Sequence, residues 1–182
     1  MSSLLFVMKK ILIIFFLFLT KVVFAEGYNI FSIGYYDIKF DGSNTADALD
    51  YRFERRFDYS LFKIGPDSYD FFDIKPFIGF EGTSDSATYF LSGIYLVDNA
   101  GTIFTGSESN YFFTPSFGIG IYDEGTGKKL GNDIEFRTTL ELSYQLQNDN
   151  RIGISYGHIS NANLGDKNPG VEILSLSYQI PY

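Results

Sequence analysis

A chain of 182 residues with a net charge of −8 and no cysteine excludes several classes of protein at the outset. The negative charge argues against a nucleic-acid partner, and the absence of thiols excludes disulfides, thiol chemistry and zinc-thiolate sites. Fourteen Tyr, twenty Phe and eighteen Gly, with a mean hydropathy near zero despite 45% apolar residues, are typical of strands with one apolar and one polar face.

The first 25 residues are predicted to be a cleaved signal peptide. Lys9 and Lys10 precede an apolar run at 11–19, and a small-x-small cleavage site ends at Ala25. An uncleaved membrane anchor is the alternative, but the run is short for a spanning helix of about 20 residues. No later segment is long and apolar enough for such a helix, so membrane insertion of residues 26–182 requires strands.

Residues 26–182 are predicted to form one all-β domain, an eight-stranded antiparallel up-and-down transmembrane β-barrel. The clearest strand is 133–147, in which apolar residues alternate with charged, hydroxyl and amide residues. Charges on one face and aliphatic groups on the other favour a polar lumen and a lipid-facing exterior over a dry sandwich core. We expect strands at 28–40, 48–63, 71–82, 87–98, 110–122, 133–147, 150–159 and 170–182.

Both termini of such a barrel lie on the periplasmic side, so the first, third, fifth and seventh connections face outward. The segment 98–110 is longer than a periplasmic turn should be and does not fit this arrangement. We expect arginines of the second strand to pair with glutamates in the lumen; the residues are Arg52, Arg55 and Arg56, with Glu135 and Glu141 as partners.

The hairpin at 156–172 holds the only histidine of the chain. Ser160 follows His158 by two residues and Glu172 follows it by fourteen. Because strand side chains repeat with period two, all three continue the apolar stripes that would face lipid. A serine nucleophile needs a base, and the base needs a carboxylate to orient it, so this hairpin contains a candidate catalytic triad.

The loop between these strands is rich in groups that bind an oxyanion. Asn161, Asn163 and Asn168 are the candidate side-chain or backbone donors. An ordinary polar rim without chemistry is the competing interpretation, but a carboxylate on a lipid-facing stripe is costly unless it is paired or lies near the interface.

The run from His158 to Asn163, then Asn168-Pro169-Gly170 and then Glu172, resembles the signature of the lipid A 3-O-deacylase (PagL) family of outer-membrane acyl hydrolases. The resemblance implies an esterase that removes the 3-O-linked hydroxyacyl chain of lipid A. It implies that His158 is the base, Ser160 the nucleophile and Glu172 the orienting acid. It also implies an oxyanion hole formed by Asn168 and a backbone amide near Asn163, which stands where the family has a glycine.

The resemblance also implies the partners: lipid A or lipopolysaccharide of the outer leaflet, and the bacterial outer membrane itself. No metal or organic cofactor is expected, and the sequence leaves the oligomeric state open, a homodimer included. Three loop lysines either meet lipid A phosphates as point charges or are ordinary solvated side chains; they are Lys128, Lys129 and Lys167.

Two other functions fit a small barrel. A non-enzymatic structural or adhesive outer-membrane protein would bind through its loops, but the predicted outer loops are short. A palmitoyl-transferring lipid A acyltransferase would usually begin with an amphipathic helix, which residues 26–48 do not predict. The predicted strand number argues against a porin, because the interior of eight strands is filled by side chains.

Overall fold

The computed structural model describes residues 26–39, 48–64 and 72–182. The predicted signal peptide, residues 1–25, and most of the first outer connection, residues 40–47, lie outside the described residues. Within those described ranges, no helix is both long enough and apolar enough to cross a membrane.

The described chain consists almost entirely of strands. The elements are β1 (Gly27–Tyr36), β2 (Ala48–Phe57), β3 (Phe62–Ile64), β4 (Phe72–Thr83), β5 (Thr88–Tyr95), β6 (Asp98–Asn99), α2 (Ala100–Thr105), β7 (Tyr111–Asp123), β8 (Ile134–Gln145), β9 (Arg151–Ser160) and β10 (Val171–Pro181). The eight long strands lie at the eight predicted places, and β3, β6 and α2 are additional.

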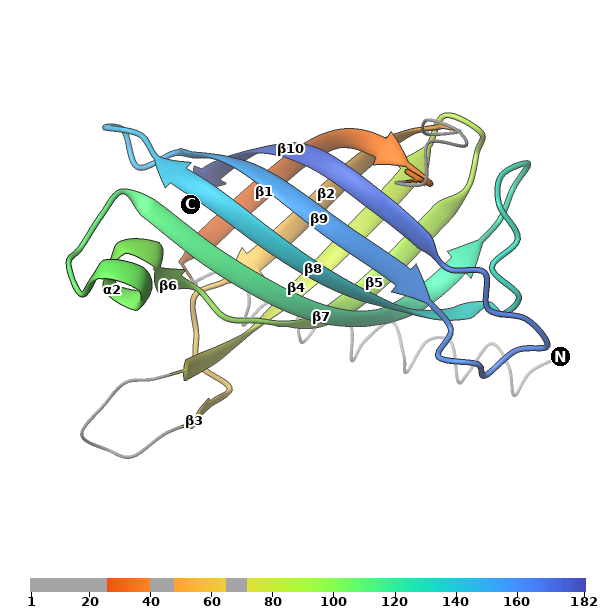
Figure 1. Cartoon of the computed structure of the whole chain (residues 1–182), viewed down its shortest axis with the longest axis horizontal. Coiled ribbons are helices and arrows are strands. Elements are labelled where there is room, and N and C mark those ends of the chain that lie inside the picture. Colours follow the sequence, from red (N-terminus) through yellow and green to blue (C-terminus); the bar gives the residue numbers. More distant parts are fainter. Residues whose placement is uncertain (1–25, 40–47, 65–71) are drawn as a thin grey trace, which may run out of the picture.

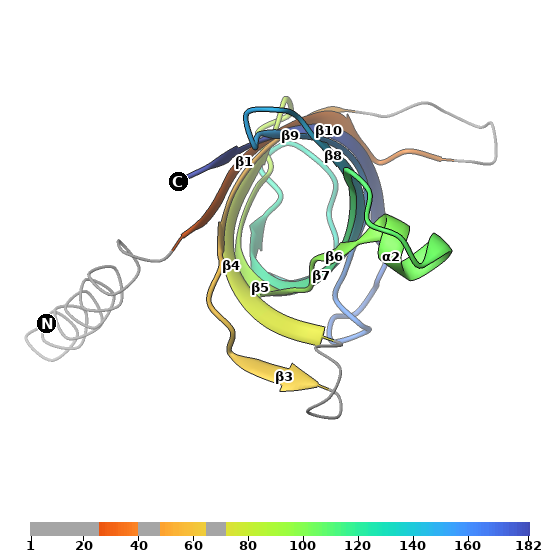
Figure 2. The same cartoon turned by 90° about the vertical axis from the view of Figure 1, so that its left-hand side faces the viewer.

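The eight long strands close into an antiparallel barrel in the order β1, β2, β4, β5, β7, β8, β9, β10 (Figure 1). The pairing of β10 with β1 runs from Tyr28↔Pro181 to Tyr36↔Ile173 and joins the two ends of the domain. Figure 2 looks along the barrel and shows the resulting ring of strands. The predicted eight-stranded antiparallel barrel is therefore confirmed, and its wall has no open edge.

The two ends of the barrel differ. The loop end, at the right of Figure 1, carries the β1–β2, β4–β5, β7–β8 and β9–β10 connections. The terminal end, at the left, is where β1 begins and β10 ends. There the predicted second strand was too long, since it stops at Phe57 instead of 63. The long connection at 98–110, which did not fit a periplasmic turn, folds into β6 and α2.

The alternation of β8 shows why the wall forms. Its charged residues Glu135 and Arg137 are at most 1% exposed and lie in the lumen, whereas Ile134 and Leu140 are 45% and 47% exposed on the outside. Each strand therefore separates polar from apolar side chains by position alone. A barrel exterior of exposed aliphatic and aromatic groups is the surface that a lipid bilayer covers.

Buried ion pairs fill the middle of the lumen. Arg137 of β8 contacts Glu54 of β2 and lies 2.8 Å from Glu81 of β4. Arg56 of β2 lies 2.7 Å from Glu141 of β8 and 3.1 Å from Glu54. These contacts cross the barrel and connect strands that are far apart in the sequence, so they become available only when the sheet has curled into a ring.

Two of the predicted lumen contacts are wrong. Arg55 lies on the outward side of β2, where its guanidinium stacks 3.9 Å from the ring centre of Tyr182. Its neighbours Arg52 and Arg56 point inward, as the two-residue period requires. Glu135 is buried but makes no ion pair with these arginines among the described residues, because it lies nearer the loop end, whereas Arg56 reaches Glu141.

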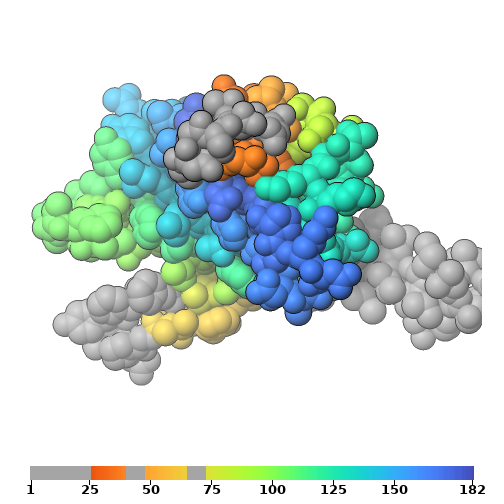
Figure 3. All heavy atoms as spheres, turned by 45° about the vertical axis from the view of Figure 1, so that its right-hand side comes forward, coloured from red at the N-terminus to blue at the C-terminus, as the bar shows by residue number. Residues whose placement is uncertain are grey.

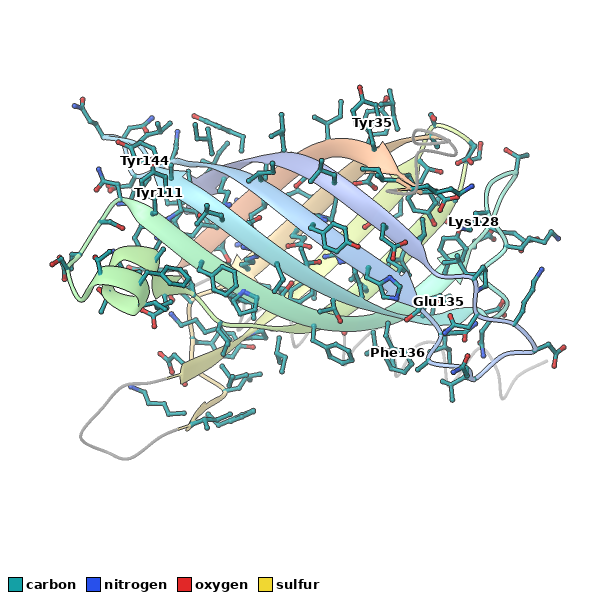
Figure 4. The ribbon with its side chains drawn as sticks, viewed as in Figure 1. Tyr35, Tyr111, Lys128, Glu135, Phe136 and Tyr144 are labelled. Carbon is teal, nitrogen blue, oxygen red and sulfur yellow. The ribbon has the colours of Figure 1, made fainter. Side chains whose placement is uncertain are left out.

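Aromatic and aliphatic side chains close the lumen at the loop end. The hydroxyl of Tyr36 lies 3.1 Å from that of Tyr122, which donates to the carbonyl of Lys128. The ammonium group of Lys128 in turn lies 2.6 Å from Asp37. Figure 4 labels Lys128 at this end. The lumen is thus a packed interior and not a channel, as eight strands require.

The lumen network predicts a large stability change for Arg137→Met. The substitution removes the ion pair of Glu81 and leaves a buried carboxylate without its counter-charge, so the free energy of unfolding should fall by about 3–5 kcal/mol. Denaturant unfolding of the barrel in lipid vesicles measures this change. Lys167→Met in an exposed loop is the control and should unfold like the wild type.

The double variant Arg137→Met/Glu81→Gln tests the cause. It removes the orphaned charge, so it should regain part of the lost stability. If the double variant is no more stable than Arg137→Met alone, the loss does not come from an unpaired Glu81.

Candidate active site

The candidate catalytic residues lie on two adjacent strands at the loop end. His158 and Ser160 are on β9, and Glu172 is on β10 directly opposite His158 in the antiparallel register. Ile159 and Val171, which alternate with them along these strands, are fully buried in the barrel. All three candidates therefore project from the outer surface of the wall, as the two-residue period predicted.

Glu172 holds His158 by a direct hydrogen bond. The Nδ1 atom of His158 lies 3.0 Å from Oε1 of Glu172, and the two side chains are 44% and 32% exposed. A carboxylate accepts hydrogen bonds, so the proton of a neutral imidazole lies on Nδ1. The lone pair of Nε2 is then free to accept a proton, which is the arrangement that a general base requires.

Ser160 lies on the same face of β9, two residues beyond His158. Its register partner on β8 is Phe136, which Figure 4 labels at the loop end. The side chains of His158 and Ser160 are not hydrogen-bonded to each other in this structure. Catalytic hydrogen bonds often tighten only when substrate is bound, and side chains two apart on one strand face are about 6.6 Å apart along the chain, so rotation of the two side chains can bring them together.

Gly170 packs against the imidazole from the side of the loop. A Cβ atom at this position would lie 2.9 Å from Cε1 of His158, closer than side chains approach one another. Gly170 also has φ of +60°, a conformation that favours glycine. The glycine thus allows the β9–β10 connection to turn directly over the histidine ring.

Asn161, the residue after Ser160, organises the loop rather than lining the surface. It is fully buried, and its Nδ2 donates to the carbonyls of Leu130 and Lys167, each at 2.8 Å. Its Oδ1 accepts from the backbone N–H of Asn163 at 2.9 Å. The expectation that Asn161 and the Asn163 amide donate to an oxyanion does not fit this arrangement, because both groups are already engaged with each other or with carbonyls.

Asn168 keeps an amide donor in the loop that follows Ser160. Its Oδ1 accepts a hydrogen bond from the backbone N–H of Asn161 at 3.1 Å. The oxygen and the NH₂ group of a side-chain amide point in different directions, so the NH₂ group of Asn168 does not face the Asn161 N–H. The side chain of Asn168 is half-buried, and its NH₂ group remains available as a donor. The residue that holds Asn168 is thus the immediate neighbour of Ser160.

The sequence did not reveal that the β7–β8 loop supports the site. A Cβ at Gly131 would lie 2.3 Å from the carbonyl of Lys167, and one at Gly165 would lie 2.2 Å from the carbonyl of Gly131. Figure 3 shows the two loops, coloured teal and blue, beside each other at this end. The glycines of the two loops were the available sequence signal for this contact. They could not be matched to each other in advance, because the contact has no characteristic sequence spacing.

The three predicted loop lysines have different surroundings. Lys128 pairs with Asp37, and Lys129 lies 2.6 Å from Glu124. Lys129 and Lys167 line a cavity of 530 Å³ between the β7–β8 and β9–β10 loops, together with Asp123, Glu124 and Asp133. The acidic residues outnumber the lysines there, so the cavity does not select for a phosphate.

The geometry gives the outer wall of the barrel a base oriented by a carboxylate, with a serine on the same face and an amide donor in the adjoining loop. No group of three or more His, Asp or Glu side chains in the described ranges is placed to hold a metal ion. The chemistry that this arrangement can perform is acyl transfer through a serine nucleophile.

Comparison with known proteins identifies a family. A family model described as lipid A 3-O-deacylase (PagL) matches residues 75–181, which include the whole candidate site. The lipid A deacylase PagL of Bordetella bronchiseptica is 39% identical over 51 residues. That segment is 28% of this chain and 29% of the relative, so the match spans less than a third of the curated protein.

Solved structures share the fold. The crystal structure of the outer membrane enzyme PagL superposes with a TM-score of 0.63 at 18% identity and covers 85% of this chain and 99% of that one. Neisserial surface protein A gives a TM-score of 0.53 at 11% identity, with coverages of 85% and 96%. At these identities the likeness concerns the eight-stranded barrel alone.

The packing of Gly170 on His158 predicts that Gly170→Ala disturbs the His158–Glu172 hydrogen bond. The chain has a single histidine, so the Nδ1–H resonance of the imidazole is unambiguous in an NMR spectrum. We expect it to shift or broaden in Gly170→Ala and to persist in Gly106→Ala. Gly106 has a φ of +72° but no neighbour within 4 Å of an added Cβ, so it controls for backbone strain. An unchanged resonance in Gly170→Ala would contradict the packing.

Proposed function

The chain belongs to the lipid A 3-O-deacylase (PagL) family of bacterial outer-membrane proteins, and we propose that it hydrolyses the ester-linked 3-hydroxyacyl chain of lipid A with Ser160, His158 and Glu172. The observation that carries the proposal is the hydrogen bond between His158 and Glu172 on the outer wall, with Ser160 on the same face. A non-enzymatic barrel has no need for an oriented histidine on its lipid-facing side.

In the proposed reaction Oγ of Ser160 attacks the ester carbonyl while Nε2 of His158 takes the hydroxyl proton. Glu172 stabilises the imidazolium that forms. The tetrahedral intermediate collapses, His158 protonates the departing sugar alkoxide, and the acyl chain remains on Ser160. Water, deprotonated by His158, then attacks the acyl-enzyme and releases the fatty acid, which restores the serine.

Asn168 is the proposed side-chain donor to the oxyanion, because its NH₂ group is the part of the amide that Asn161 leaves available. The N–H of Asn163 is not part of the proposed set, since it is bonded to Asn161. Asn161 is instead a positioning residue that fixes the loop next to Ser160. No second chain takes part in this scheme, so it operates in a monomer or a homodimer.

The position of the site fits a lipid substrate in the outer leaflet. Ser160 and His158 lie on the exterior of the barrel near its loop end, next to outward apolar residues such as Phe136 and Tyr156. An ester bond at the junction of sugar and acyl chain would meet the site from the membrane, without passing through the packed lumen. Residues 1–25 are proposed to direct export, so that the mature chain begins at Glu26.

Substitution of the nucleophile and of the acid tests the mechanism. Purified lipopolysaccharide incubated with the refolded protein should lose one 3-hydroxyacyl mass, as followed by mass spectrometry of lipid A. Ser160→Ala and Glu172→Gln should each lower the rate on the order of 10⁴-fold, the first by removing the nucleophile and the second by losing the histidine tautomer.

Ser107→Ala, an exposed serine at the terminal end, is the matched control and should retain the wild-type rate. Full activity of Ser160→Ala would refute the assignment of the nucleophile. Folded wild-type protein that leaves several lipid A types unchanged would refute the deacylase function itself and favour a structural barrel.

Asn168→Asp tests the oxyanion donor without disturbing the loop. Aspartate keeps the oxygen that accepts from the Asn161 N–H but has no NH₂ group, so kcat should fall by about 10²–10³-fold with little change in KM. Ala162→Asp places the same charge at an exposed position of the same loop and measures the effect of charge alone. Equal rates for the two variants would remove Asn168 from the mechanism.

A further inference from the structure

Two small elements stand outside the barrel wall at the terminal end. Figure 2 looks along the barrel and shows β3 and α2 beyond the ring of strands. Both expose large apolar side chains: Phe62 and Ile64 of β3 are each 52% exposed, and Ile103 and Phe104 of α2 are 47% and 74% exposed. The proposed reaction uses neither element.

β3 leaves the wall because β4 extends past its barrel partners. β4 pairs with β5 from Lys75 and with β2 from Phe77. Its first residues, Phe72 to Ile74, pair with β3 instead. All three residues of β3 are exposed. β3, paired with the first residues of β4, therefore lies outside the ring of barrel strands, as Figure 2 shows.

α2 is too short to be stable by itself and is held by its surroundings. Oδ1 of Asn99 accepts from the N–H groups of Gly101 and Thr102 at 3.0 and 3.3 Å, and Asn99 Nδ2 donates to the carbonyl of Ser109 at 2.6 Å. Ala100 is the buried residue of the helix. A fixed helix thus turns Ile103 and Phe104 away from the protein, so their exposure does not come from a frayed segment.

The level of these elements along the barrel is marked by tyrosines. Tyr111 and Tyr144, labelled at the terminal end in Figure 4, pack with ring centres 5.0 Å apart at the edge of the outer apolar face. Aromatic residues in this position form the girdle that meets the lipid head groups. Figure 1 shows β3 and α2 at the same end, so they extend along the membrane plane near this level.

We propose that β3 and α2 are interfacial anchors whose apolar side chains insert into the phospholipid leaflet at the terminal end of the barrel. Their exposed apolar side chains lie near the level at which the lipid-facing wall ends. Phospholipid is therefore the partner that we assign to them, because a bilayer surrounds that wall. β3 also has the composition of an interfacial segment, with large apolar residues at Phe62 and Ile64 on either side of a basic residue. The proposal is independent of the proposed reaction.

The absence of tryptophan from the chain makes a direct test available. Phe104→Trp and Phe62→Trp each introduce one fluorophore, and the variants are refolded into phospholipid vesicles with bromine atoms either near the head-group end or deep in the acyl chains. Leu142→Trp on the outer wall and Asn148→Trp in the exposed β8–β9 turn are the lipid and water references.

The anchors should emit at shorter wavelength than Asn148→Trp and lose most of their emission to the shallow bromines. Leu142→Trp should be quenched more by the deep ones. Emission from Phe104→Trp and Phe62→Trp that matches Asn148→Trp and resists both bromine positions would overturn the proposal. A shift that depends on protein concentration, without quenching, would also overturn it and identify a second copy as the partner.

Discussion

In a bilayer every backbone donor and acceptor of the wall must find a partner within the protein, and this requirement governs the rest of the structure. The ring satisfies it by pairing β10 with β1 and β2 with β4. Closure with eight strands makes the interior narrow, and the period of two sends every second side chain into it. The interior therefore has to be filled, and paired charges such as Arg137 and Glu54 fill it.

The same period accounts for the position of the candidate site. The outward positions of β9 and β10 hold apolar residues in the middle of each strand. At the loop end the same outward positions hold His158 and Glu172. Their contact depends on register rather than on loop conformation. The loop contributes in another way, because it positions Asn168 and Gly170 around the histidine and is itself held by Asn161 and the neighbouring β7–β8 loop.

Features with short-range causes could be predicted from the sequence. The eight strands follow from alternation, and the His158–Glu172 contact follows from the register of two consecutive antiparallel strands. The pairing of Arg56 with Glu141 was foreseen, but the inward parity of β2 was not resolved, so Arg55 was misplaced. α2 was missed because its six residues are too few to show a helical period, although its N-cap, Asn99, is a local signal. The bond from Asn161 to Leu130 joins residues 31 positions apart in two irregular loops, where no periodicity exists to align them.

The ion pairs of the lumen have a consequence for how the chain folds and comes apart. Arg56 and Glu141 are separated by 85 residues and lie on strands that are not neighbours in the ring. In an open, water-filled sheet these groups are solvated singly, and they meet only when the seam between β1 and β10 shuts and the water leaves. Assembly therefore ends in one concerted, dehydrating step, and a barrel that loses any wall strand loses the network as a whole.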